Sequence, residues 1–181
     1  GSVNTESYDG TSWTEENNVA LGRDQLGSAG TQSLALAMGG TPPITATSEE
    51  WNWDSTIVAG AWATSNNINL ARQLSGSVGT QTAGLIFGGY TGPNDGETET
   101  ESYDGSSWTE VADMATVGNN LDGNGSATAA LRVGGTSNPT TIVAVSTVFL
   151  GAITPILWSS TVTKKDSEVL AAYALKKING S

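Results

Sequence analysis

The side chains in this sequence that are best suited to chemistry are its carboxylates. The chain of 181 residues contains 18 Asp and Glu but no His and no Cys. Without His it lacks the usual general base at neutral pH and the commonest metal ligand. Without Cys it has no thiol nucleophile, thiolate ligand or disulfide. Glycoside hydrolysis needs only two carboxylates, so the composition still permits that enzyme chemistry.

The carboxylates form two clusters, Glu49–Glu50 and the alternating Glu97, Glu99 and Glu101. Alternation places the second set on one face of a strand, and like charges so close together favour solvent or a cation. We therefore interpret them as a wet acidic edge that discourages strand pairing. The stretch from Asn94 to Glu97 offers oxygen ligands for Ca²⁺ but lacks the spacing of an EF-hand loop, so a hairpin tip is the simpler interpretation. We expect no catalytic residues, cofactor or metal, and hence no enzyme.

Tryptophan offers a second kind of chemistry, because its flat face stacks on sugars. The chain has six Trp. Three of them, Trp13, Trp62 and Trp108, recur at regular intervals, and we predict that they pack between repeats. Trp51 and Trp53 are the candidates for glycan binding, although one of them takes the place that Tyr8 has in the first copy.

An internal repeat positions these side chains. The stretch Thr5–Trp13 (TESYDGTSW) returns at Thr100–Trp108 (TESYDGSSW), and a blurred copy covers Ser48–Trp62. The three recurring Trp lie 49 and 46 residues apart, and the same two spacings separate the glycine pairs Gly39–Gly40, Gly88–Gly89 and Gly134–Gly135. A period of this length is typical of β-propeller repeats.

Each repeat predicts four short strands. A small-residue strand (Gly27–Gly30, Gly76–Gly79) suits a crowded inner position. An apolar run (Ser33–Met38, Thr82–Phe87) then leads into the glycine pair and indicates burial on both faces. The Tyr-Asp-Gly turn joins the outer two strands. The predicted fold is all-β, a propeller-like array of four-stranded antiparallel blades with about three and a half repeats.

The repeats are expected to occupy residues 1–163, and a tail follows at 164–181. Asp166–Lys177 in the tail has an acidic start and a basic finish, which predicts a short C-terminal helix. The apolar stretch Ile142–Trp158 is marginal for a membrane span, and its β-branched residues favour two strands of the last blade. The expected boundaries are a half blade at 1–14 and blades at about 25–64, 73–110 and 122–163.

An apolar run into Gly-Gly, followed by a Tyr and a Trp a few residues apart, resembles the kelch repeat of β-propellers. The Tyr and Trp are closer together here than in kelch. The phrases TESYDGTSWTE and GTQTAGLIFGG are similar to kelch-like or galactose-oxidase-like repeat proteins of bacteriophage and environmental bacterial genomes. The resemblance covers about Thr5 to Gly135 and implies a propeller fold in a virion or surface component. It is carried by Tyr8, Trp13, Tyr103, Trp108 and the three glycine pairs.

Two further residue types recur or form motifs. Arg23 and Arg72 share one repeat position, where the third copy has Gly118. They could hold a ligand, but recurrence favours a structural salt bridge or a backbone bond between blades, because repeated units make repeated interfaces. Asn124 and Asn179 each begin an Asn-Gly-Ser sequon, which matters if the source glycosylates secreted proteins.

Charge and strand count lead to the functional hypotheses. Seven Lys and Arg against 18 acids give a net charge of −11, which disfavours nucleic acid and anionic lipid as partners. The unfinished half blade favours a structural, self-assembling subunit of an extracellular filament, phage appendage or surface structure. The partner would then be another copy of the chain. The alternative is a glycan-binding propeller for surface recognition. Both place the protein outside the cell or on a virion, without a membrane span.

Overall fold

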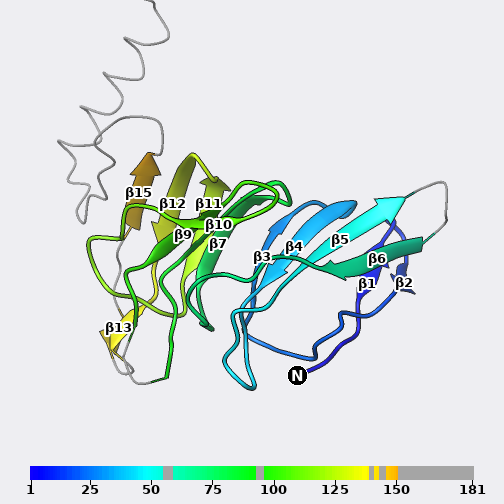
Figure 1. Ribbon diagram of the computed structural model, residues 1–181, viewed down its shortest axis with the longest axis horizontal. Coiled ribbons are helices and arrows are strands. Elements are labelled where there is room, and N and C mark those ends of the chain that lie inside the picture. The colour runs from blue at the N-terminus through cyan, green and yellow to red at the C-terminus, as the bar shows by residue number, and fades with distance from the viewer. Residues whose placement is uncertain (55–58, 93–95, 139–140, 143–145, 151–181) are drawn as a thin grey trace, which may run out of the picture.

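The computed structural model describes residues 1–54, 59–92, 96–138, 141–142 and 146–150. Within these residues the protein is all-β (Figure 1), and no helix among them is long and apolar enough to cross a bilayer. The predicted helix at Asp166–Lys177 lies outside the described residues. The strands are β1 (Glu6–Tyr8), β2 (Trp13–Glu15), β3 (Gly27–Gly30), β4 (Leu34–Met38), β5 (Ser48–Asp54), β6 (Ala59–Thr64), β7 (Gly76–Thr80), β8 (Ala83–Phe87), β9 (Thr100–Tyr103), β10 (Trp108–Glu110), β11 (Asp122–Ser126), β12 (Ala129–Val133), β13 (Thr136–Asn138), β14 (Thr141–Ile142) and β15 (Ser146–Leu150).

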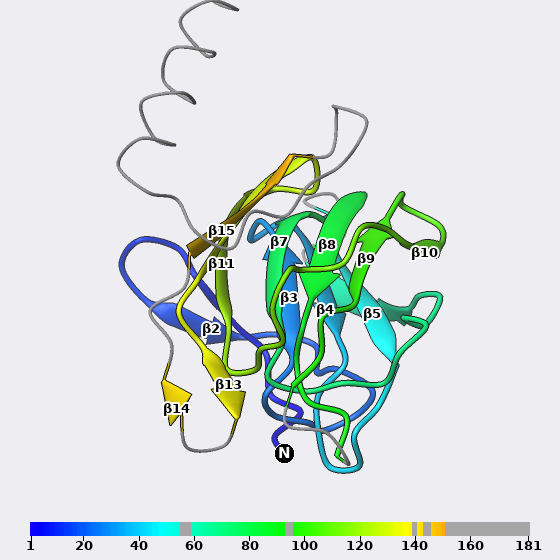
Figure 2. The ribbon, with the colours of Figure 1, turned by 90° about the vertical axis from the view of Figure 1, so that its left-hand side faces the viewer.

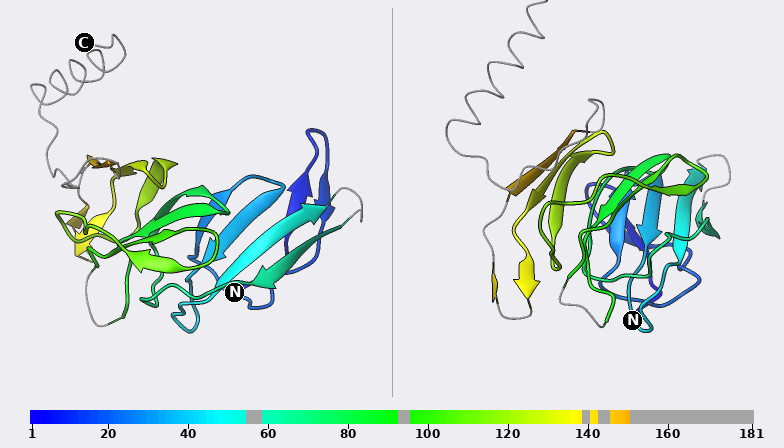
Figure 3. Two further views of the ribbon diagram at one scale, coloured as in Figure 1. Left: turned by 45° about the horizontal axis from the view of Figure 1, so that its top comes forward. Right: turned by 60° about the vertical axis from the view of Figure 1, so that its left-hand side comes forward.

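The strands form a row of antiparallel sheets, as the repeat predicts. We call β1–β2 the half blade, β3–β6 the first blade, β7–β10 the second blade, and β11, β12 and β15 the third blade. Strands that are consecutive in sequence are neighbours in the first two blades. The half blade lies at one end of the row and the third blade at the other (Figures 1 and 3). Among the described residues the sheets do not close into a ring, as the three and a half repeats indicate. One feature was not predicted: β13 and β14 form a small separate sheet.

The inner strands β3, β7 and β11 lie side by side (Figure 2), and small side chains let them approach. The backbone N–H of Ser28 donates to Ser77 Oγ at 2.9 Å, and Ser77 Oγ donates to the Ser28 carbonyl at 2.8 Å. At Gly123 a Cβ atom would come within 2.8 Å of both Phe87 and Val78. Larger residues at these positions would push the blades apart.

The glycine pairs allow a second close approach, between the end of one blade's second strand and the linker that leads into the next blade. The N–H of Gly40 donates to the carbonyl of Arg72, and the N–H of Gly89 donates to that of Gly118, both at 2.8 Å. A Cβ atom on Gly39 would lie only 2.5 Å from the same Arg72 carbonyl. Gly39 and Gly40 also have φ values of 66° and 105°, which side chains disfavour. The first two pairs therefore each dock the linker that enters the next blade.

The second strand of each complete blade packs against the next blade. Leu36 and Met38 of β4 form one buried cluster with Tyr103, Trp108 and Ile86 of the second blade. Another set repeats the contact one blade further along, where Leu85 and Phe87 of β8 pack with residues of the third blade and its linker: Ala130, Met114, Leu121 and Ala127. The core is thus divided into layers between blades.

A buried ion pair lies in each complete blade. Arg23 lies 3.0 Å from Glu49, and Arg72 lies 2.6 Å from Glu101. In each pair the arginine precedes the inner strand and the carboxylate lies on the third strand of the same blade. Burial lowers the pKa of Arg23, and Glu49 opposes that shift. The Arg72 guanidinium also donates to the carbonyls of Gly88 and Glu99.

These pairs correct one expectation from the sequence. Glu49 and Glu101 do not form a wet acidic edge, because both side chains are buried. A buried carboxylate needs a cation and hydrogen bonds to offset its desolvation. Glu101 obtains them from Arg72 and from the backbone N–H groups of Asn69 and Leu70. The carboxylates therefore fasten each linker to its blade.

We predict that Glu101→Gln destabilises the protein by about 3–5 kcal/mol, because it leaves the Arg72 charge buried without its partner. The control is Glu110→Gln on the adjacent strand, where the side chain is exposed and the expected change is below about 0.5 kcal/mol. Urea unfolding followed by circular dichroism measures both. Equal stability of the two variants would show that the ion pair does not hold the blade together.

Candidate functional site

The half blade is the feature of this fold whose surroundings differ most from those of its repeat. Its hairpin matches the hairpin of β9 and β10 in register. Tyr8 pairs with Trp13, as Tyr103 pairs with Trp108. The ring centroids lie 5.1 Å and 4.9 Å apart, respectively. Nearly identical sequences have therefore built the same local structure twice.

An aspartate forms the turn in both hairpins. Asp104 Oδ1 accepts hydrogen bonds from the backbone N–H groups of Ser106 and Ser107, each at 2.8 Å. Asp9 does the same with Thr11 and Ser12. The N–H groups of Ser107 and Ser106 lower the pKa of Asp104 to about 2, and the pKa of Asp9 is also lowered, first by Ser12. These carboxylates are structural turn residues.

Burial distinguishes the two hairpins. In the second blade Tyr103 and Trp108 are 2% and 7% exposed, whereas in the half blade Tyr8 and Trp13 are 44% and 67% exposed. The Tyr103 hydroxyl also bonds with Ser65 and Glu50 of the first blade. The first blade therefore covers the β9–β10 hairpin, and among the described residues no blade covers the matching side of β1–β2.

In the half blade and the two complete blades, the third strand of the repeat carries a carboxylate, which is exposed in the half blade and buried in the complete blades. Glu6, Glu49 and Glu101 share one repeat position, each two residues before the aromatic residue of that strand. Glu49 and Glu101 are buried in ion pairs, but Glu6 is exposed. The half blade thus presents a carboxylate and two aromatic rings that elsewhere in the chain are internal.

The register settles which Trp replaces Tyr8. Trp51 pairs with Trp62 on β6, and their rings lie 5.6 Å apart, so Trp51 is the aromatic of the first blade. It is buried, and its Nε1 donates to the carbonyl of Gln32 at 2.9 Å. Trp51 therefore packs between the repeats, as Trp62 and Trp108 were predicted to do, and Trp53 remains as the candidate for glycan contact.

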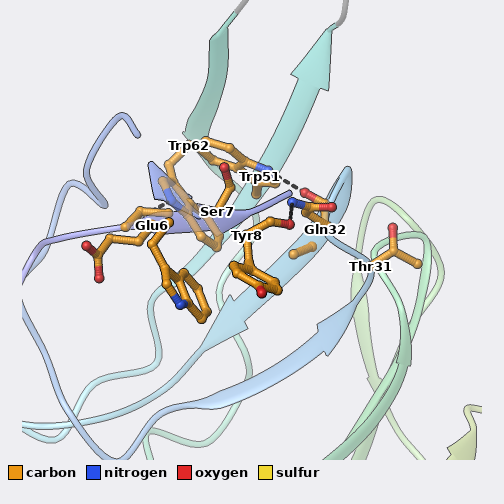
Figure 4. A pocket seen from close by; sticks show the side chains of 10 residues that line it. Glu6, Ser7, Tyr8, Thr31, Gln32, Trp51 and Trp62 are labelled. Carbon is orange, nitrogen blue, oxygen red and sulfur yellow. Dashed lines mark hydrogen bonds between the residues drawn. The ribbon is translucent and has the colours of Figure 1, made fainter. Parts of the chain in front are cut away.

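A cavity of about 420 Å³ lies between the half blade and the first blade (Figure 4). The rings of Tyr8, Trp51 and Trp62 line it, and Gln32 crosses it to donate to the Tyr8 carbonyl at 2.7 Å. Gln81 makes the equivalent bond to the Trp51 carbonyl at 2.8 Å. Leu36 and Met38 pack on the matching aromatic pair, Tyr103 and Trp108. This cavity therefore lies where inner strands of the half blade would pack.

A second cavity, of about 340 Å³, lies beside Trp53. It is more polar than the first, because the half blade contributes Asp9, Thr14 and Glu16 and the first blade contributes Gln32 and Ser33. Trp53 has no aromatic counterpart in the other hairpins, where Gly10 and Gly105 hold its repeat position. An aromatic face next to carboxylates and hydroxyls is the chemistry that recognises sugars.

The remaining candidates are scattered. Asn124 lies exposed on the inner strand β11, whereas Asn94, Asp95 and Asn179 lie outside the described residues. Glu97 Oε1 accepts a hydrogen bond from Thr91 and Glu99 from the Thr98 N–H. Within the described part of the chain, no three His, Cys, Asp or Glu residues are grouped to hold a metal.

Sequence reasoning missed Arg132, which is buried in the third blade. A Cβ atom on Gly118 would lie 2.3 Å from the Arg132 guanidinium. The guanidinium therefore occupies the space that Arg23 and Arg72 fill from the linker position in their blades. The signal was the loss of arginine at Gly118 together with a charge in an otherwise apolar strand.

Comparisons with known proteins support the fold and leave function open. No family model matches the chain, and no curated protein matches it significantly. Among solved structures, the chain is similar to YjhT, a propeller-type fold, with a TM-score of 0.74 and 9% sequence identity. The match covers 87% of this chain and 52% of the YjhT chain. The chain therefore spans about half the length of that structure.

We predict that the same substitution destabilises the protein by very different amounts in the two hairpins. Trp108→Ala should destabilise the protein by about 3–5 kcal/mol, because it empties a buried site. Trp13→Ala should cost less than about 1 kcal/mol in the dilute, unassociated protein, because most of the ring is already in water. Urea unfolding at low protein concentration measures both. A large cost for Trp13→Ala would mean that the half blade is covered within a single chain.

Proposed function

We propose that this chain is a non-enzymatic assembly protein with kelch-like blades, which associates with further copies of itself through its half blade. The observation that carries the proposal is the contrast between the two matching hairpins. Tyr8 and Trp13 are exposed in the half blade, and their counterparts are buried in the second blade. Burying two aromatic side chains stabilises an interface by several kcal/mol.

The second support comes from the strand edge. β1 has β2 as its one strand neighbour among the described residues, so its other edge offers backbone N–H and C=O groups for pairing. An incoming strand pair would satisfy these groups and line the 420 Å³ cavity. Strand addition obtains affinity from such backbone bonds and specificity from alternate side chains. The setting that we propose is an extracellular filament, phage appendage or surface structure.

We predict that Trp13→Glu abolishes self-association, because it would place a carboxylate where an aromatic ring should be buried. Thr14→Glu is the matched control, because it makes the same change one residue away, where the equivalent Thr109 is exposed in the second blade. Light scattering coupled to gel filtration measures the mass of each variant. The wild type and Thr14→Glu should associate and Trp13→Glu should be monomeric. A wild type that stays monomeric at high concentration would contradict the proposal.

A second candidate function, glycan binding, is favoured by the polar cavity beside Trp53. We predict that Trp53→Ala lowers the affinity for an immobilised glycan at least tenfold, because it removes the stacking face. Trp53→Phe is the control, because it keeps an aromatic ring. Glycan-array binding followed by titration of any positive glycan measures this effect. An array without a positive glycan would argue against this candidate.

A further inference from the structure

The two ends of the row of blades are complementary. The half blade provides two outer strands, and the face that carries Tyr8 and Trp13 is uncovered. The third blade provides two inner strands, and the face that would pack on a following blade is uncovered. Val133 is 50% exposed, although its counterparts Met38 and Phe87 are fully buried. Gly134 has no described atom within 4 Å of its Cβ position, whereas Gly39 touches the next linker there.

Arg132 is the buried charge that the third blade leaves incompletely paired. Its guanidinium donates to the carbonyl of Thr116 at 3.0 Å, to Thr116 Oγ1 at 3.1 Å and to the carbonyl of Val117 at 3.4 Å, and it contacts Met114 Sδ. Among the described residues, the arginines paired with a carboxylate are Arg23 and Arg72. Nε of Arg132 has no hydrogen-bond partner in that part of the chain.

Glu6 is the carboxylate that stands at the matching repeat position. It is exposed, while Glu49 and Glu101 are buried with their arginines. The described residues contain three cationic side chains, Arg23, Arg72 and Arg132, and all three are buried. Of these, Arg132 is the one for which no carboxylate is described.

The register of the second blade shows how the two ends would meet. There β8 pairs with β9 so that Ile86 lies opposite Glu101 and Phe87 lies opposite Thr100. The repeat aligns Ile86 with Arg132 and Glu101 with Glu6. The same register on β12 therefore places Glu6 opposite Arg132 and Thr5 opposite Val133. Side chains directly opposite on one sheet face are close enough to pair.

We propose that β1 of a second copy pairs with β12, so that the third blade of one copy is completed by the half blade of another and Glu6 joins Arg132. In the single chain β15 holds this edge and places Thr147 opposite Arg132. Exchange of β15 for β1 keeps a backbone ladder on β12. It adds a carboxylate opposite the buried arginine and covers the exposed aromatic rings, so the exchange favours the complex.

The other contacts of a complete blade follow from the same alignment. Tyr8 and Trp13 of the second copy would pack on Leu85 and Phe87 of the first copy, as Tyr103 and Trp108 pack on Leu36 and Met38. In the opposite direction, Leu131 and Val133 would enter the cavity beside Trp51 and Trp62 of the second copy. They hold the repeat positions of Leu36 and Met38, which cover the aromatic pair of the second blade.

This pairing is reciprocal and closes with two copies, so a filament, appendage or surface structure would be built from closed dimers. Each copy has two complete four-stranded blades and contributes to two shared ones. Two copies therefore make a ring of about six blades, within the usual range of four to eight. Three copies would exceed the usual blade number.

The inference rests on the proposed self-association, and a disulfide test separates the two. The chain contains no Cys, so Thr5→Cys and Val133→Cys can be made singly and mixed. Directly opposed strand positions meet the distance required for a disulfide. Mild oxidation should give a crosslinked dimer in the mixture and none with either variant alone. A mixture of Val133→Cys and Thr14→Cys is the control, because Thr14 lies on β2, away from the proposed pairing.

Charge reversal tests the ion pair. Glu6→Arg should raise the dissociation constant of the dimer at least about 30-fold, because it places a second cation against the buried guanidinium of Arg132. Glu15→Arg is the matched control. Glu15 lies directly opposite Glu6 in the same hairpin, but its counterpart Glu110 is exposed in the covered second blade. It should change the constant by less than about threefold.

The outcomes are distinguishable. Three results together support the inference: a crosslink between Thr5→Cys and Val133→Cys, a wild-type mass of two copies, and a higher dissociation constant for Glu6→Arg. A dimer without the Thr5–Val133 crosslink overturns the proposed partner strand and leaves the proposed function standing. A wild-type assembly of more than two copies, measured by light scattering, overturns the closed ring. A protein that is monomeric at all concentrations overturns both the inference and the proposed function.

Discussion

The interaction on which the rest of this structure depends is the packing of the outer-strand aromatic pair of one blade on the apolar inner strand of the blade before it. A twisted four-stranded sheet with apolar side chains on both faces is stable only when both faces are covered. Tyr103 and Trp108 obtain that cover from Leu36 and Met38. The glycine pairs and inner-strand glycines bring the blades close enough for this contact. Every open end of such a row therefore leaves apolar surface exposed to water, which is unfavourable.

The buried ion pairs add specificity to this packing. An arginine and a carboxylate taken out of water contribute little net stability, but each is costly when the other is missing. Arg23 and Arg72 meet carboxylates from their own blades. Arg132 enters the third blade from a strand instead of a linker, and burial lowers its pKa without an opposing charge in the described residues. A buried cation at one end and an exposed Glu6 at the other would fix which strands pair.

Much of the fold could be predicted from the sequence. The strand expected at Gly27–Gly30 has the observed bounds, because small residues flanked by turns leave few alternatives. The Asp-Gly hairpins were also predicted, because the turn chemistry is local. The β13–β14 sheet was missed, because it has no counterpart in the other repeats. The burial of Glu101 was missed as well, because its charge is offset by Arg72, which lies 29 residues away and has no local signal. The exposure of Tyr8 and Trp13 could not come from their sequence, which is almost that of their buried counterparts.

The central claim is that β1 is a docking strand whose free edge is covered by a second copy. Hydrogen exchange of the backbone amides, measured by mass spectrometry on a peptide covering β1 across a range of protein concentrations, tests it most directly. The account predicts that protection of β1 rises with concentration while that of β9, which is already covered within the chain, stays constant. Equal exchange of β1 at every concentration would contradict the account.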